Sequence, residues 1–151
     1  MLLKLQNYFG DEVEVVPSVG LYTVKDFAGA ELHTLGLALE CEEDGDLVPY
    51  ATLTTNFGEY IGIKNCAYID TNNNPFAEAF LQENNIATPT GLVMRSGFVD
   101  YPLYRFNEDF LREVGGSAYQ TYSKEYDDYM AFMYGDQTEE PDEDSGMSEV
   151  Q

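Results

Sequence analysis

Basic residues are scarce in this chain, which has seven lysines and arginines against 28 aspartates and glutamates in 151 residues. The formal net charge is therefore −21. A chain with this charge is repelled by DNA, RNA and anionic membrane surfaces, and it is attracted to strongly basic surfaces. The composition argues against direct nucleic-acid or membrane binding and favours a basic protein as partner.

Long hydrophobic runs are also absent. Nowhere do roughly eighteen apolar residues follow one another without a charge, which is the length that a membrane-spanning helix needs. The first nine residues contain one lysine and only short apolar pieces, unlike a secretion signal. The sequence predicts a cytoplasmic protein.

Histidine and cysteine, the usual residues of zinc sites and nucleophilic catalysis, are nearly missing. His33 is the only histidine, and Cys41 and Cys66 lie in two segments that are typical of strands. A zinc site or a catalytic relay would need distant partners for His33, and no local motif marks either cysteine as a nucleophile. We expect a structural histidine and two reduced thiols. The sequence predicts no catalytic residue, no metal and no cofactor, and hence a protein that is not an enzyme.

One segment begins like a calcium-binding loop, because Asp70, Asn72 and Asn74 offer oxygen atoms at its first, third and fifth positions. However, Pro75 stands where the loop needs glycine, and Leu81 stands where it needs a bidentate glutamate. We interpret the segment as an asparagine-rich turn before a helix.

The acidic residues divide between a body and a tail. Residues 135–151 contain seven carboxylates and no base, so that −21 minus −7 leaves −14 on residues 1–134. The tail also has glycine, proline and serine and very few apolar residues, which predicts a disordered segment. Residues 1–134, with 44% apolar residues in the chain as a whole, are long enough for one folded domain.

Alternating apolar and β-branched residues dominate the first part of the chain and predict strands. Asp44-Gly45 predicts a tight hairpin between the strands 32–41 and 48–55. The predicted strands are Leu2–Phe9, Glu12–Val16, Leu21–Val24, Leu32–Cys41, Tyr50–Thr55, Cys66–Asp70, Thr90–Val99 and Tyr101–Phe106.

Three helices are predicted after or between these strands. Asn74 and Pro75 favour the start of a first helix, whose face of Phe76, Ala79 and Phe80 would pack on the sheet. Asn107 is expected to cap a short second helix that ends at Gly115-Gly116. The third helix, residues 117–134, carries a stripe of Tyr119, Tyr122, Tyr126, Tyr129 and Met133 at steps of three and four. Together these elements predict an α+β fold, a largely antiparallel sheet with two or three packed helices.

Two blocks of sequence carry a resemblance to a known family. The first runs from Tyr68 to Glu78, Y-I-D-T-N-N-N-P-F-A-E, and the second from Ser96 to Asn107, S-G-F-V-D-Y-P-L-Y-R-F-N. They resemble the corresponding blocks of the domain of unknown function 4313 family, over roughly residues 48–112. The resemblance implies a small cytosolic protein from plasmids, integrative elements or phages of gut bacteria, with no established activity. It leaves the tyrosine-rich helix and the tail outside the shared region.

The shared blocks have two interpretations. Their asparagines, Pro75 and Gly97 suit turns, and their tyrosines suit packing across a sheet, so the blocks can simply maintain the fold. Alternatively, a polar pocket at the end of the sheet could bind a small ligand or substrate. Its candidate residues are Asp70, Asn72, Asn73, Arg95 and Tyr101.

The charge leads to the main functional hypothesis, a protein that mimics nucleic acid and occupies the basic binding surface of a host defence protein. Carboxylates can stand in for phosphates, and tyrosines provide rigid apolar contacts. An RNA-guided nuclease such as Cas9 or a restriction enzyme fits this description. An acidic adaptor without mimicry is the alternative. The candidate contact residues are Tyr122, Glu125, Tyr126, Asp127, Asp128 and Tyr129 in the helix and Glu42, Glu43, Asp44 and Asp46 in the hairpin.

Overall fold

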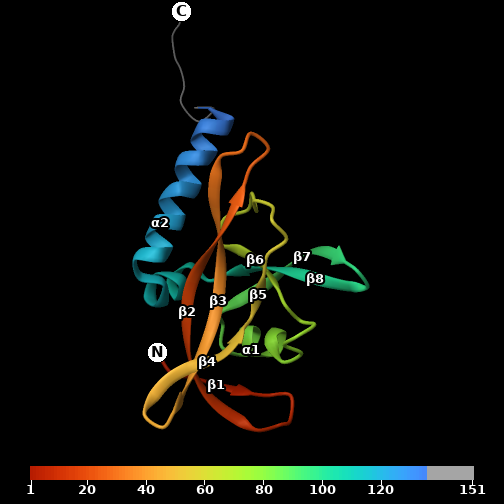
Figure 1. The fold of residues 1–151 in the computed structure, drawn as a ribbon, viewed down its shortest axis with the longest axis vertical. Coiled ribbons are helices and arrows are strands. Elements are labelled where there is room, and N and C mark those ends of the chain that lie inside the picture. Colours follow the sequence, from red (N-terminus) through yellow and green to blue (C-terminus); the bar gives the residue numbers. More distant parts are fainter. Residues whose placement is uncertain (136–151) are drawn as a thin grey trace, which may run out of the picture.

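The fold combines two antiparallel sheets with two helices (Figure 1), as a computed structural model of residues 1–135 shows. The predicted α+β class is confirmed. The single sheet that the strand pattern suggested is instead divided into two. Apart from Gly135, the tail predicted for residues 135–151 lies outside the described residues.

The first sheet contains β1 (Leu3–Gln6), β2 (Glu12–Lys25), β3 (Glu31–Glu43) and β4 (Asp46–Thr52), in that order. The two strands predicted within residues 12–24 form the single long strand β2. Pro17 does not end β2. The pairing of β2 with β1 stops at Val15, which lies opposite Leu3, so Pro17 has a partner strand on one side only, β3. Proline is tolerated at such an edge position.

The predicted hairpin at Asp44-Gly45 is confirmed and joins β3 to β4. Both residues have positive φ, 54° and 89°, as a type I′ turn requires. The aspartate and the glycine are residue types that adopt this conformation at little cost.

The second sheet contains β5 (Thr54–Thr55), β6 (Cys66–Ile69), β8 (Val99–Phe106) and β7 (Ala87–Ser96), in that order. The chain passes from one sheet to the other at Leu53, which is fully buried. Its N–H donates to the Leu37 carbonyl of the first sheet, and its carbonyl accepts from Asp70 N–H next to the second. Leu53 therefore joins the two sheets by backbone hydrogen bonds.

Helix α1 (Ala77–Glu83) begins later than the sequence suggested. Asn74 was expected to cap it, but the Asn74 side chain donates to the carbonyl oxygens of Thr52 and Asp70 at 2.7 and 3.2 Å. This buried amide thus binds two backbone carbonyls and does not cap the helix. The helix buries Ala77, Phe80 and Leu81, whereas Ala79, predicted to face the sheet, is exposed.

Helix α2 (Glu108–Tyr134) begins as predicted, with the Asn107 side chain accepting the Asp109 N–H at 2.9 Å. The predicted break at Gly115-Gly116 is a sharp kink, because Gly116 has φ 52° and ψ −135°. The longer segment after the kink runs along β2 and β3 (Figure 1). No helix within residues 1–135 is long and apolar enough to cross a membrane.

One hydrophobic core lies where these elements meet. On β3, Leu35, Leu37 and Leu39 point to the same face, as the two-residue period of a strand requires. They belong to a cluster that also includes residues of α1, α2 and the second sheet. The first sheet is thus covered on this face by α2 and by the second sheet.

We predict that Gly115→Ala destabilises the protein by about 1–3 kcal/mol, the usual cost of overpacking. A Cβ atom at position 115 would lie 2.5 Å from Tyr119 Cβ, which cannot move without shifting the helix. Gly62→Ala is the control, because its Cβ would meet only Met130 Cε at 3.8 Å. Denaturant unfolding compares the two variants, and equal stability would contradict the packing argument.

Candidate protein-binding surface

The tyrosine stripe of α2 faces the protein's own core at its first half. Tyr122 is 2% exposed, and its hydroxyl accepts the N–H of Asn65 at 2.9 Å. The Tyr119 hydroxyl donates to Asn65 Oδ1, also at 2.9 Å. Tyr122, predicted to contact a partner, is therefore not on a surface. An amphipathic helix is stabilised mainly by burying its apolar face, so the Tyr122 ring packs in the protein's own core and is not available to a partner.

The second half of the stripe fastens neighbouring loops to the helix. Tyr126 donates to the Gly62 carbonyl at 2.9 Å, and Tyr129 donates to the Asp26 carboxylate at 2.8 Å in the turn between β2 and β3. Both side chains are half-buried. Their hydroxyls are engaged within the chain, so any contact with a partner would use only the ring faces.

The surroundings of these tyrosines shift their ionisation. Burial raises the pKa of Tyr122 and of Tyr126. The Tyr129 pKa is raised by its hydrogen bond to Asp26, and the same bond lowers the pKa of the Asp26 carboxyl. Burial also raises the pKa of Tyr60, whose hydroxyl is buried without a hydrogen-bond partner in the described structure. All these phenols are thus held in the neutral form.

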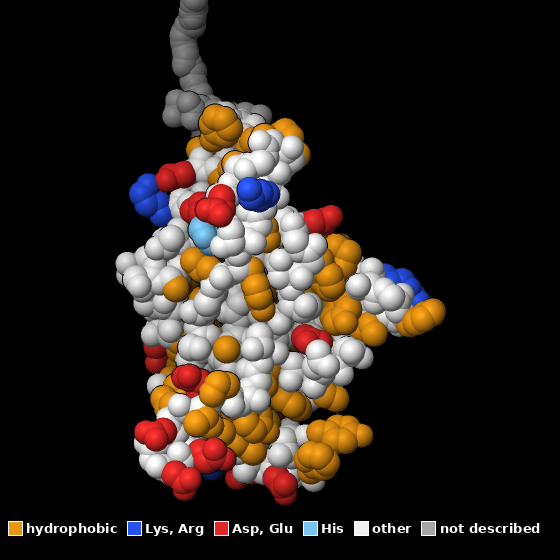
Figure 2. Space-filling model, viewed as in Figure 1, with side chains coloured by type: hydrophobic (Ala, Val, Ile, Leu, Met, Phe, Trp, Pro, Cys, Tyr) orange, Lys and Arg blue, Asp and Glu red, His pale blue; other side chains and the backbone are white. Residues whose placement is uncertain are grey.

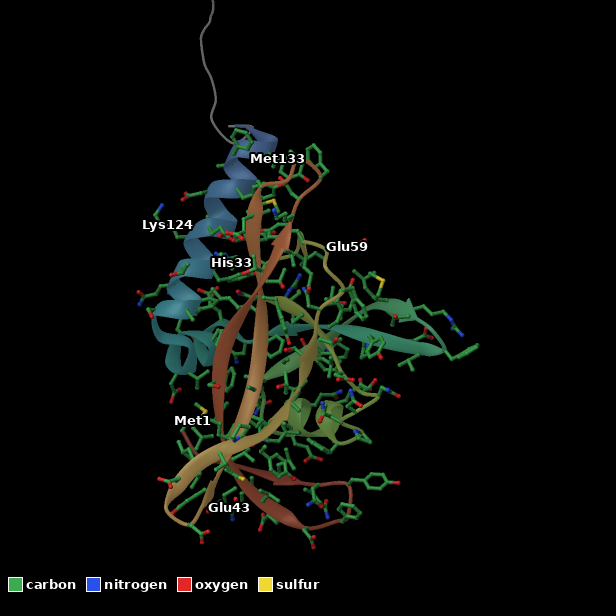
Figure 3. The ribbon with its side chains drawn as sticks, viewed as in Figure 1. Met1, His33, Glu43, Glu59, Lys124 and Met133 are labelled. Atoms are coloured by element: carbon green, nitrogen blue, oxygen red, sulfur yellow. The ribbon has the colours of Figure 1, made fainter. Side chains whose placement is uncertain are left out.

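His33 has the structural role that was expected of it. It lies on β3 facing α2 (Figure 3), and its Nδ1 lies 2.9 Å from Glu125 Oε1. The other carboxylate oxygen of Glu125 accepts the His33 backbone N–H at 2.8 Å. Glu125, predicted to contact a partner, instead holds the helix to the sheet.

The carboxylates of α2 are mostly paired with basic groups. Asp127 binds Lys64 at 2.9 Å, and Asp128 binds Lys124 at 2.6 Å one helical turn away. Lys124 points outward from the helix (Figure 3). Glu108 binds Arg112, so that four of the six acids in α2 have a cationic or histidine partner. The anionic surface expected around residues 122–128 is therefore largely neutralised locally.

A larger excess of carboxylates collects at the opposite end of the first sheet. We call residues 1–16 and 40–47 the acidic end, because they contain eight acids and only one base, Lys4. The Glu43 end of the β3–β4 hairpin and Met1 lie at this end in Figure 3, and red side chains gather there in Figure 2. Its predicted members Glu42, Glu43, Asp44 and Asp46 are all exposed. Their role in binding stays a prediction.

The acidic end is split by a cleft. The ladder between β2 and β3 stops at Val16 and Glu40, and beyond it the β1–β2 and β3–β4 hairpins run separately (Figure 1). The space between them has a volume of about 720 Å³. Four carboxylates line this cleft from both hairpins: Glu12, Glu14, Glu42 and Asp44. Lys4, Val13, Cys41 and Gly45 complete the lining.

Exposed aromatic side chains lie beside these carboxylates. Phe9, in the turn between β1 and β2, is 83% exposed and packs edge-to-face on the exposed Tyr8, with ring centroids 5.4 Å apart. The sequence interpretation missed this turn. The turn residues Asn7, Gly10 and Asp11 in the run Asn7-Tyr8-Phe9-Gly10-Asp11 could have indicated it, but Tyr8 and Phe9 between them are typical of a strand. The acidic end thus combines negative charge with apolar contact area.

The predicted polar pocket is not assembled. Asp70 accepts hydrogen bonds from Asn73 within its own turn, at 3.1 Å from the backbone N–H and 2.8 Å from the side-chain amide, and Asn72 is exposed. Arg95 pairs with Asp100 across the β7–β8 hairpin, and Tyr101 packs on Phe57. No hydrogen bond or ion pair between described residues joins these two groups. The hydrogen bonds of Asp70 are local in sequence, the Arg95–Asp100 pair lies within one hairpin, and Tyr101 contacts the distant Phe57 through its ring.

The two sequence blocks meet through their backbones and one partly buried hydrogen bond. Tyr68 on β6 pairs with Leu103 on β8, and the hydroxyl of Tyr104 donates to Glu78 Oε1 at 2.5 Å and accepts from Gln82 at 2.8 Å. Burial, with the Glu78 hydrogen bond, raises the pKa of Tyr104 to about 12. These contacts support the structural interpretation of the blocks.

Residues 1–135 show no further cluster of side chains that would suit catalysis or metal binding. Both cysteines are free, and burial raises the pKa of the Cys66 thiol. No group of three or more His, Cys, Asp or Glu side chains in this range is arranged to hold a metal ion.

Comparison with known proteins extends the resemblance seen in the sequence. The family model described as "Domain of unknown function (DUF4313)" matches residues 22–126, which is 105 of the 151 residues. The match is wider than the expected residues 48–112 and includes β3, β4 and the tyrosine stripe as far as Tyr126. The β1–β2 turn lies outside it. No curated protein and no solved structure matches the chain.

We predict that Glu125→Ala costs about 1–3 kcal/mol, because it leaves the partly buried His33 N–H and Nδ1 without their acceptor. Asp128→Ala, which removes an exposed pair with Lys124, should cost no more than about 0.5 kcal/mol. Thermal unfolding of both variants tests the difference. Equal losses would show that Glu125 does not anchor the helix.

We also predict that the protein loses stability as the pH rises from 10 towards about 12. The folded-state pKa of Tyr104, about 12, exceeds the ordinary value of 10, so the unfolded chain releases this proton first and is favoured above pH 10. Denaturant unfolding, with tyrosinate absorbance, measures the effect. Tyr104→Phe should make the decline less steep, and an unchanged slope would contradict the assignment.

Proposed function

The chain belongs to the DUF4313 family, and we propose that this member binds a basic, nucleic-acid-binding surface of another protein through its acidic end. The observation that carries the proposal is the concentration of eight acids against one base over two neighbouring hairpins. Such a field steers a cationic surface towards the acidic end and repels nucleic acid.

The acidic end has features that suit mimicry of nucleic acid. Its carboxylates project from two diverging hairpins, so they can meet arginines and lysines that would otherwise bind phosphates or base edges. Tyr8 and Phe9 supply exposed rings beside them, and aromatic residues are frequent anchors of protein interfaces. The partner class we propose is a host defence enzyme inside the bacterial cell, either an RNA-guided nuclease of the Cas9 type or a restriction enzyme. The producer would be a phage or another mobile element.

The exposed rings also favour a second candidate, an adaptor that binds a protein without competing for nucleic acid. Aromatic contact area contributes to binding regardless of salt, whereas a contact made mainly of ion pairs weakens as salt screens the charges. Tyr8 and Phe9 therefore make the adaptor a real alternative. The two functions differ in whether DNA or RNA displaces the chain from its partner.

Competition with nucleic acid is the direct experiment. Affinity capture from a host lysate supplies partners, and a purified RNA-guided nuclease and a restriction enzyme are assayed for DNA cleavage in the presence of the chain. Mimicry requires inhibition that weakens with salt, and displacement of the chain by excess substrate nucleic acid. Binding that DNA or RNA does not affect would favour the adaptor, and failure to bind any nucleic-acid-processing protein at low salt would reject mimicry.

We predict that removing four charges from the β3–β4 hairpin weakens partner binding at least about tenfold, since rim and cleft charges set the attraction to a basic surface. A control variant removes four exposed acids elsewhere that have no ion pair among residues 1–135, so both variants have the same net charge. The test variant changes Glu42 and Glu43 to glutamine and Asp44 and Asp46 to asparagine; the control changes Glu31, Glu59, Glu83 and Glu113 to glutamine. Titration calorimetry compares them, and equal losses would mean that net charge alone, not the acidic end, determines binding.

A further inference from the structure

The β7–β8 hairpin projects from the body of the protein and carries exposed apolar side chains (Figure 1). Phe98, in its two-residue turn, is 98% exposed, and Val93 on β7 is 59% exposed; Leu92 is exposed beside it. In Figure 2 the projecting tip is orange and blue on the face shown. Isolated apolar residues are common on surfaces, but this one hairpin exposes three large ones.

The hairpin also presents an unpaired strand edge. Strand β7 is the last strand of its sheet, and β8 is its only ladder partner within the described residues. The ladder is interrupted between Pro89 and Val93, and the outer stretch Val93–Ser96 pairs regularly with Val99–Pro102. On its other side this stretch has backbone N–H and C=O groups available to another strand.

The charge of this region is opposite to that of the rest of the chain. Residues 84–107 contain two arginines and one aspartate, a net charge of +1 in a protein of net −21. Arg95 and Asp100, which form an exposed pair at 3.2 Å, cancel each other. A second strongly acidic molecule can therefore approach this hairpin without local repulsion.

From these three observations we infer that the outer stretch of β7 pairs with β7 of a second copy of the chain. A two-fold axis through the β7 edge would bring Val93–Ser96 of each copy into one antiparallel ladder and bury the apolar side chains next to it. The inference does not depend on the proposed function, because it uses the opposite charge and another part of the molecule.

The charge gives this association a distinctive salt dependence. Two copies of net charge −21 repel each other, and salt screens that repulsion over a Debye length of about 8 Å at physiological ionic strength. Self-association should therefore strengthen as salt increases. Binding of a basic partner at the acidic end should weaken over the same range, so failure of one idea is distinguishable from failure of the other.

Analytical ultracentrifugation of the full chain at increasing sodium chloride concentration tests the inference. We expect a dimer that strengthens with salt, and we expect Val93→Lys to weaken it at least about tenfold, because it places a charged, hydrated side chain at each end of the shared ladder. Phe27→Lys is the matched control, since Phe27 is 86% exposed in the turn between β2 and β3. Phe98→Lys is a second variant in a turn, usable if the strand substitution impairs folding.

Amide hydrogen exchange identifies the mode of contact. Pairing of the strand edges predicts slower exchange within residues 93–96 as protein concentration rises, whereas contact through side chains alone leaves it unchanged and contradicts the ladder. A monomer at every salt concentration overturns the inference, as does equal weakening by Phe27→Lys and Val93→Lys. A monomer in which Val93→Lys abolishes binding of a captured protein would assign the hairpin to that partner instead.

Discussion

The buried hydrogen bonds between Asn65 and the tyrosines of α2 determine how the rest of the structure is arranged. Asn65 accepts from Tyr119 and donates its backbone N–H to Tyr122, so the segment before β6 and the kinked helix are held together in the core. Asn65 has a positive φ of 66°, which asparagine tolerates better than most residues. With this contact in place, α2 lies against β2 and β3, and its aromatic face packs within the protein instead of facing solvent.

The docking of α2 also decides where free negative charge remains. Once the helix lies on the sheet, Glu125 reaches His33 and Asp127 reaches Lys64, and both carboxylates acquire partners distant in sequence. The two hairpins at the other end of the sheet have almost no basic residues within reach, and the closest pair, Lys4 with Glu12, is long at 4.0 Å and exposed. Charge that was spread over the sequence is thereby concentrated at one end of the fold.

Local signals in the sequence predicted the elements that depend on local geometry. The Asp44-Gly45 turn, the Asn107 cap and the break at Gly116 each follow from the backbone preferences of one or two residues. Asn74 was misread because its amide binds the Thr52 carbonyl, 22 residues away, and no local pattern reports such a partner. The same limit applies to the candidate site: the exposed hairpin acids were predictable, whereas the burial of Tyr122 and the pairing of Glu125 depend on tertiary contacts.

The β7–β8 hairpin stands apart from this electrostatic arrangement. Elsewhere the exposed surface of the chain is rich in carboxylates, which keep it hydrated and separate from other acidic molecules. Burial does not explain why residues 84–107 contain only one acid, because Leu92, Val93 and Phe98 are exposed. An exposed edge strand with few charges promotes association with another strand, and Arg95 is the one charged residue in the outer stretch of β7. The contact that we propose between two copies of the chain uses both this free edge and the scarcity of negative charge around it.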